Sequence, residues 1–181
     1  EFYGREFICD DRALIPRADT ETLVDVSLEL IDELELSTVA DIGTGGGVIA
    51  VTLAAEREEL ALLATDTSEA ALELARENAS RHKPAGRVTF AQGPWLEPVF
   101  EEGWTERLEM VVSNPPYIRE DELDSLMPEI VEHEPREALV DTEPDGMGAY
   151  RAIIEQCPSL PNLQAAAFEV GEGQAADVAD L

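Results

Sequence analysis

The residues with the clearest chemical potential are Asn114, Pro115, Pro116 and Tyr117, which come shortly after the apolar run 110–112. An amide oxygen, together with backbone carbonyls that prolines hold rigid, could accept both N–H groups of a planar amide or amino group. Such a nitrogen is a poor nucleophile and must be oriented before it can take a methyl group. The motif therefore indicates methyl transfer to nitrogen, although alone it fits a strand-ending turn about as well.

A glycine-rich loop at residues 43–47 follows a short apolar run and precedes an apolar helical stretch. Glycines let the backbone approach a nucleotide-containing ligand, whose negative group faces the helix N-terminus. Val48 breaks the GxGxxG pattern of dinucleotide sites, whereas Asp41 completes the DxGxGxG pattern typical of S-adenosylmethionine-dependent methyltransferases. Either cofactor class would use Asp66, after the next apolar run, to accept hydrogen bonds from the ribose hydroxyls.

Both features have a purely structural alternative, since glycine loops occur as turns and Asp66 could simply cap a helix. The position of Asn114 favours the functional interpretation. It ends the fourth predicted strand, which in a sheet of this topology adjoins the first strand at the carboxyl edge. Loop, acid and amide would then meet at one place.

Alternating strands and helices are predicted to position these residues. Helical periodicity covers residues 19–36, and a second, apolar helix is predicted from the glycine loop to about Ala55. A third predicted helix carries Ala71 to Ala79. Thr67 or Ser68 would cap its start, and Pro84-Ala85-Gly86 would end it. The predicted strands are Val39–Ile42, Leu60–Ala64, Val88–Ala91, Met110–Ser113 and Ala165–Val170. Such βαβ units predict an α/β fold, a Rossmann-like three-layer sandwich with a mostly parallel sheet.

The chain is expected to divide into a leading part and a catalytic domain. Residues 1–36 hold a short hairpin or extended arm, Phe2–Ile15, and then a helix; residues 37–181 form the domain. The segment 120–143 is acidic, holds two prolines and is predicted to be an irregular, functional excursion with short helical pieces. Gly173 to Leu181 starts a helix and then stops.

The charge excludes some functions. Among 181 residues there are 40 acidic and 12 basic ones, a formal net charge of −28, with Lys83 as the single lysine. Stable nucleic-acid binding is disfavoured, because phosphates need a basic surface. Acidity spread along the whole chain favours adaptation to high salt, where screening removes self-repulsion; the alternative is an unusually acidic protein from an ordinary cytoplasm.

Cysteine and histidine spacing gives no metal site. Cys9 and Cys157 form no CxxC pair, and His82 and His133 show no metal-ligand spacing. The sequence contains no run of 18 apolar residues, so no membrane-spanning helix is predicted. A cytoplasmic protein is expected, and the sequence does not indicate its oligomeric state.

The chain resembles the release-factor glutamine methyltransferases, protein-(glutamine-N5) methyltransferases that modify the Gly-Gly-Gln glutamine of peptide chain release factors. The matching segments are Phe2 to Phe7, Leu14 to Glu21, the glycine loop, Asn114 to Ile118, His133 to Arg136, Asp145-Gly146 with Tyr150-Arg151, and Glu169 to Gly171. Asn-Pro-Pro-Tyr alone is shared with DNA adenine methyltransferases. The Ile-Pro-Arg and His-Glu-Pro-Arg segments narrow the resemblance from this wider group to the release-factor glutamine methyltransferases.

The resemblance implies S-adenosylmethionine as cofactor, S-adenosylhomocysteine as product and a peptide release factor as partner. Cofactor residues would be Asp41, Gly43, Thr44, Gly45, Gly46, Gly47, Asp66 at the ribose, Trp95 at the adenine and Asn114. Asn114, Pro115 and Tyr117 would be catalytic, and with Pro116 and Arg17 would bind the substrate. Pro94 replaces the aspartate usual before the tryptophan, and Ala18 replaces a usual proline.

Two expectations concern what surrounds these residues. The family normally has an N-terminal helical domain and a final strand pair, so we expect both to lie outside this sequence and substrate recognition to be weakened without them. His133 and Arg136 are expected to form structural ion pairs within the acidic excursion, near Glu129, Glu132, Glu134 and Glu137. The competing functions are an N6-adenine methyltransferase acting on DNA or RNA and a catalytically silent cofactor-binding domain.

Overall fold

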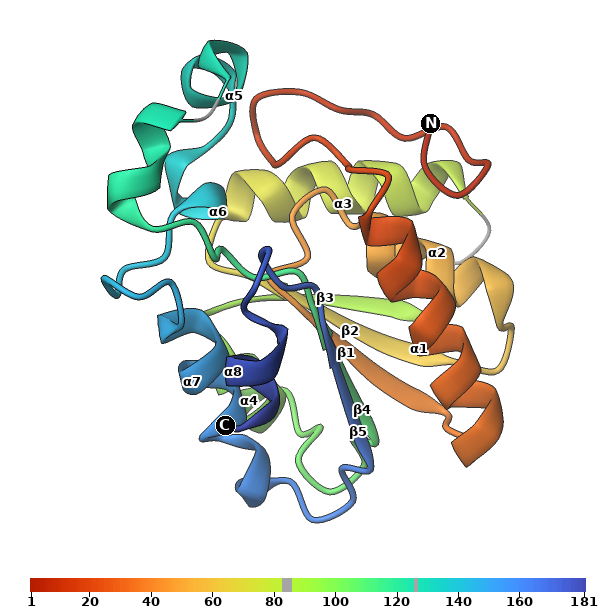
Figure 1. Ribbon diagram of the computed structural model, residues 1–181. Helices are drawn as coiled ribbons and strands as arrows, with labels where there is room; N and C mark the ends of the chain where they lie inside the picture. The colour runs from red at the N-terminus through yellow and green to blue at the C-terminus, as the bar shows by residue number, and fades with distance from the viewer. Residues whose placement is uncertain (83–85, 126) are drawn as a thin grey trace.

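The computed structural model describes residues 1–82, 86–125 and 127–181. Its centre is a parallel sheet of five strands in the order β3-β2-β1-β4-β5, with helices on both faces (Figure 1). The strands are β1 Thr38–Ile42, β2 Ala61–Asp66, β3 Val88–Gln92, β4 Met110–Ser113 and β5 Ala165–Phe168. The predicted fold class is confirmed, and each strand lies within two residues of its predicted position.

The two faces of the sheet bury separate cores because side chains alternate along each strand. On one face Val39, Leu62 and Met110 pack against α1 Thr20–Leu34 and α2 Val48–Glu56. On the other face Ala40, Leu63 and Val111 pack against α4 Glu97–Glu101 and α7 Gly148–Ile154. Helix α3 Glu69–Arg81 lies beside α2 over β2 and β3 (Figure 1).

Helix ends follow their local sequence. Ser68 caps α3 as predicted, because its hydroxyl accepts the backbone N–H of Ala71 at 3.2 Å. Helix α1 ends at Glu35 in the left-handed conformation. Pro84 and Ala85, expected to close α3, lie outside the described residues. Two helices, α4 and α7, had no sequence prediction.

A short hairpin and an extended arm were the two alternatives predicted for the first residues, and the structure shows the arm. Phe2 and Arg5 make a single antiparallel bridge around a tight turn, and the described residues 6–17 hold no helix or strand. Asn78 of α3 fixes the arm: its amide oxygen accepts the N–H of Ile8 at 2.7 Å, and its NH₂ donates to the carbonyls of Ile8 and Gly46. One buried side chain thus joins the arm to the glycine loop.

The acidic excursion consists of short helical pieces, as predicted. They are the 3-10 helix η1 Glu120–Ser125, α5 Pro128–His133 and α6 Arg136–Leu139. The chain returns beside its starting point, where Ile118 and Val140 form a parallel bridge. A further 3-10 turn, η2 Cys157–Ser159, precedes β5, and α8 Ala175–Ala179 follows it. None of the described helices has the length and apolar character needed to cross a membrane.

We expect Leu53→Ala, in the middle of α2, to lower the free energy of unfolding by about 2–5 kcal/mol, because Leu53 is 0% exposed and its removal leaves a cavity. Leu34→Ala on α1 is the matched control, since Leu34 is 38% exposed and should cost about 0.5 kcal/mol or less. Urea unfolding followed by circular dichroism measures both. Equal losses would contradict the packing described here.

Candidate active site

The register of β1 against β4 brings the glycine loop and Asn114 together. Ile42 pairs with Ser113, the last residue of each strand, and the Ser113 hydroxyl donates to the Ile42 carbonyl at 2.6 Å. Gly43 and Asn114 therefore leave the sheet side by side at its carboxyl edge. This is the position predicted from the strand order.

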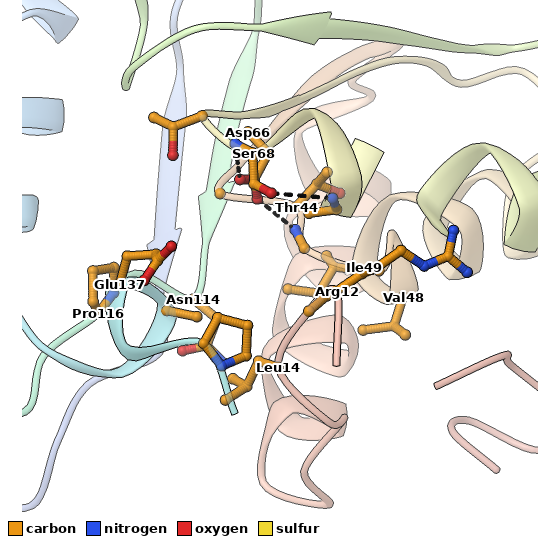
Figure 2. Close-up of a pocket in the computed structure, with 18 of the residues that line it drawn as sticks. Arg12, Leu14, Thr44, Val48, Ile49, Asp66, Ser68, Asn114, Pro116 and Glu137 are labelled. Carbon is orange, nitrogen blue, oxygen red and sulfur yellow. Dashed lines mark hydrogen bonds between the residues drawn. The ribbon is translucent and has the colours of Figure 1, made fainter. Parts of the chain in front are cut away.

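A cavity lies at this edge, between the glycine loop, the arm and the excursion. Figure 2 shows Thr44, Asp66 and Ser68 on one side of it and Asn114, Pro116 and Glu137 on another. A second cavity adjoins it, and the two share Leu14, Arg17, Asn114, Pro116 and Ala138. Pro115, Tyr117 and Glu169 line only the second cavity. Asn114 thus faces two neighbouring spaces.

Asp66 holds the glycine loop while lining the first cavity. One carboxylate oxygen accepts the N–H of Gly45 and the other accepts the N–H of Ser68, both at 2.9 Å. Burial raises the pKa of Asp66, although these backbone donors oppose the shift. A carboxylate oxygen accepts more than one hydrogen bond, so Asp66 retains acceptor capacity for a ligand's hydroxyls. Gly43, Thr44, Gly45 and Gly46 line the cavity beside it.

Asp41 and Gly47 lie behind the loop rather than on the cavity. Asp41 is fully buried, and one of its oxygens accepts the Thr44 hydroxyl at 2.6 Å and the N–H of Ala50 at 3.1 Å. Gly47 has φ 79°, and a Cβ there would sit 2.9 Å from the Cβ of Ala75. Neither is among the residues that line the cavity. Their expected contact with a cofactor would therefore be made indirectly, through the loop that they shape.

Trp95 lines the first cavity and also packs on the core beneath it. Its φ of 48° places it in the left-handed region, which costs a non-glycine residue on the order of 1 kcal/mol. The neighbouring backbone is tied down, because the N–H of Gly93 donates to the Asp66 carbonyl and the Pro94 carbonyl accepts the N–H of Glu97. The indole is thus held at the cavity wall by structure on both sides.

The side chain of Asn114 is part of a hydrogen-bonded series that the sequence did not indicate. Its NH₂ donates to the Thr20 hydroxyl at 3.3 Å, and that hydroxyl donates to a carboxylate oxygen of Glu169 at 2.6 Å. Thr20 begins α1, and Glu169 follows β5. Both residues lie in segments that carry the family resemblance, and this resemblance was the one feature of the sequence that could have pointed to them. Nothing in their spacing links them to Asn114.

Tyr117 is held beside the second cavity. Its carbonyl accepts the side-chain N–H of Gln174 at 3.3 Å, while the oxygen of Gln174 accepts the N–H of Gly171 at 2.9 Å. Burial raises the pKa of Tyr117, and the negative charge of Glu169 adds to the shift. Its phenol therefore remains neutral at ordinary pH.

Arg17, which lines both cavities, connects the arm to the excursion through Glu134. The guanidinium of Arg17 lies 2.6 Å from one oxygen of Glu134, whose side chain is 4% exposed. Arg136 also forms an ion pair within the excursion, with Glu120, whereas the side chains of Glu129 and Glu132 lie outside the described part of the structure. The side chain of His133 lies outside the described part of the structure.

No cluster of metal-binding side chains occurs among the described residues. The candidate site thus offers glycine backbone, a buried carboxylate, an indole and an oriented amide. These groups suit an organic ligand with hydroxyls and a flat ring.

Comparison with known proteins gives both a family and close relatives. The Methyltransferase small domain family matches residues 20–142. Release factor glutamine methyltransferases from Bacillus anthracis and Bacillus subtilis are 44% and 41% identical over 99% of this chain. One from Moorella thermoacetica is 42% identical over all of it. The chain spans only 63%, 62% and 62% of these relatives' own lengths.

Solved structures share the fold at low sequence identity. The hMettl16 catalytic domain, in complex with MAT2A 3'UTR hairpin 1, superimposes with a TM-score of 0.76 at 17% identity, covering 98% of this chain and 65% of that one. A human methyltransferase 10 domain containing protein gives a TM-score of 0.65 at 16% identity, covering 98% and 76%. These likenesses extend to the fold alone.

The buried carboxyl of Asp41 predicts a pH dependence of stability. Burial raises its pKa to about 7, so the folded state binds the proton more tightly than the unfolded state does. This stabilisation is fully present below about pH 4 and is lost as the pH rises through about 7. The free energy of unfolding of Asp41→Asn, minus that of the parent, should therefore increase from pH 5 to pH 8 in urea titrations. A constant difference would show that Asp41 is ionised throughout.

Proposed function

The chain belongs to the methyltransferase small domain family, and from this premise we propose that it methylates the side-chain amide nitrogen, N5, of a glutamine in a peptide chain release factor, with S-adenosylmethionine as methyl donor. The observation that carries the proposal is the place of Asn114. Its side chain lies where the cavity of the glycine loop meets a second cavity lined by Pro115 and Tyr117. A donor and an acceptor could meet across it.

The first cavity suits the proposed cofactor by the chemistry of its lining. Asp66 can accept hydrogen bonds from the ribose hydroxyls, Trp95 can stack on the adenine, and the loop of residues 43–46 lets the backbone approach the methionine portion. Pro94 offers no side-chain hydrogen bond, so adenine recognition would rest on the indole and on backbone groups. When bound, S-adenosylmethionine supplies an electrophilic methyl group on its sulfonium.

The residues of this chain would act by positioning the acceptor. The Asn114 side-chain oxygen and the Pro115 carbonyl accept the two amide hydrogens, which turns the nitrogen lone pair towards the methyl group. S-adenosylmethionine, held by Asp66, Trp95 and the loop of residues 43–46, would supply the methyl group and be left as S-adenosylhomocysteine, while the acceptor nitrogen would give up a proton to water. Tyr117, with Pro116, would pack on the glutamine side chain. No strong base is needed in this scheme.

Charge favours a protein acceptor over a nucleic acid. The two arginines that line the cavities are already paired, Arg12 with Asp10 and Glu77 and Arg17 with Glu134. In Figure 2 the guanidinium of Arg12 points away from Asn114. Phosphate contacts need unpaired cations, which the site does not offer among the described residues. The names of the relatives support a release factor as the partner, and Arg17 would contact it by exchanging its carboxylate partner.

The cellular setting is part of the same proposal. Release factors act in the cytoplasm, where we place the reaction. The 40 acidic and 12 basic residues support a surface adapted to high salt. The relatives extend well beyond the length that this chain spans, and engagement of the whole release factor is proposed to draw on such additional regions.

The decisive experiment is incubation with labelled S-adenosylmethionine and, separately, a release factor bearing Gly-Gly-Gln and duplex DNA or a structured RNA. We expect label in the release factor and none after the glutamine is replaced by asparagine. Label in the nucleic acid alone would establish the N6-adenine alternative. Cofactor binding without transfer to any acceptor would favour a silent binding domain.

Asn114→Ala should lower kcat for the release factor by about 10²–10³, equivalent to about 2.7–4 kcal/mol, as for removal of one preorganised polar group at a reaction centre. Cofactor affinity, measured by isothermal titration calorimetry, should change little, because Asp66, Trp95 and the loop remain. Asn162→Ala is the matched control, since Asn162 is exposed and, among the described residues, its side chain donates only to the Glu106 carbonyl. Loss of cofactor binding in Asn114→Ala would instead make Asn114 a binding residue.

A further inference from the structure

We propose that Thr20 and Glu169 are positioning residues that fix which end of the Asn114 side chain faces the acceptor. An asparagine amide has an oxygen that accepts hydrogen bonds and an NH₂ that donates them, at nearly equal positions. Only one of its two orientations can receive the N–H groups of a substrate amide. The catalytic consequence rests on the proposed function, whereas the orientation itself follows from the contacts.

The orientation is set by a series of hydrogen bonds with one possible direction. An ionised carboxylate only accepts, so the Thr20 hydroxyl must give its single hydrogen to Glu169, at 2.6 Å. The Thr20 oxygen then has only lone pairs to offer Asn114. The group of Asn114 that lies 3.3 Å away must therefore be the NH₂. Within the described residues, the side-chain oxygen of Asn114 accepts no hydrogen bond and is available to a substrate.

Thr20 has no freedom to reverse this arrangement. Thr20 is 3% exposed although it lines the first cavity, so little of the hydroxyl is open to water. It is the first residue of α1, whereas Asn114 and Glu169 directly follow β4 and β5. These strands are neighbours, and the N–H of Glu169 donates to the Ser113 carbonyl at 3.0 Å, beside Asn114. The three side chains are therefore held by three separate elements.

The reversed amide would oppose the reaction. It would turn an NH₂ towards the acceptor NH₂, so that two donors face each other and the lone pair of the nucleophile is misdirected. Glu169 holds the Thr20 hydroxyl through one carboxylate oxygen, and through that hydroxyl it orients Asn114. Because misplacement of a reacting group can cost about 10²-fold in rate, loss of the Thr20 hydroxyl should lower kcat by roughly 10- to 100-fold.

The test compares Thr20→Val, which keeps the shape but loses the hydroxyl, with Thr20→Ser, which keeps the hydroxyl. Thr22→Val is the matched control, because Thr22 is exposed on the same helix. With a release factor as acceptor, Thr20→Val should lower kcat by about 10- to 100-fold with KM changed less than about threefold. Thr20→Ser should restore most of kcat, Thr22→Val should equal the parent, and the cofactor Kd from calorimetry should be unchanged throughout.

A second measurement reports on Asn114 without any reaction. In the nuclear magnetic resonance spectrum of the protein, the two side-chain N–H resonances of Asn114 should be distinct, with one proton protected from exchange by Thr20. That protection should persist in Thr20→Ser and disappear in Thr20→Val. It depends on no acceptor, so it tests the orientation even if the release factor is not methylated.

The outcomes separate this inference from the proposed function. If the parent protein methylates no release factor, the proposed function fails, and the resonances of Asn114 alone decide the orientation. If Thr20→Val keeps the parent's kcat and its protected proton, the inference is overturned. Should Thr20→Val not fold, Glu169→Gln takes its place: its NH₂ can donate to Thr20 and permit the reversed series, so a lower kcat supports the inference and an unchanged kcat overturns it.

Discussion

The site depends on the alignment of β1 with β4. Because Ile42 and Ser113 are paired and both end their strands, the chain leaves the sheet at two adjacent points on one level. The Ser113 hydroxyl donates to the Ile42 carbonyl and so links the ends of the two strands. A shift of one residue would turn Asn114 to the opposite side of the strand, away from the glycine loop. Both cavities follow from this register.

Buried polar groups around the site mainly hold backbone in place. Asp41 binds the start of α2, Asp66 binds the loop at Gly45, and Asn78 binds the loop at Gly46. Each satisfies N–H or carbonyl groups that a tight glycine turn leaves without partners. The acids near the site therefore act mainly by holding the backbone in place through hydrogen bonds. Asp41 can do this even when its carboxyl group is protonated.

The sequence predicted what local patterns determine and missed what tertiary contacts determine. Strands appear as short apolar runs between turn residues, and the glycine loop, Asp66 and Asn114 were each placed correctly at the sheet edge. Asp41 and Gly47 were expected at the cofactor but lie behind the loop. A motif shows which residue types recur in the loop, not which side of the turn each one occupies. Helices α4 and α7 are too short for clear periodicity. The Thr20 contact joins positions that are 94 residues apart, beyond the reach of any local pattern.

The arm and the excursion close the site from opposite ends of the sequence. Arg17 and Glu134, 117 residues apart, form an ion pair, and Glu134 is buried although its second oxygen has no hydrogen-bond partner among the described residues. Removing one partner of such a pair costs more than the pair contributes, because a buried charge is left alone. The pair therefore fixes the excursion against the arm, and its cation, Arg17, lines both cavities. In the proposed reaction the acceptor amide would be recognised within the cavities by neutral groups, Asn114 above all, and the remainder of a large acceptor would be bound by surfaces outside them.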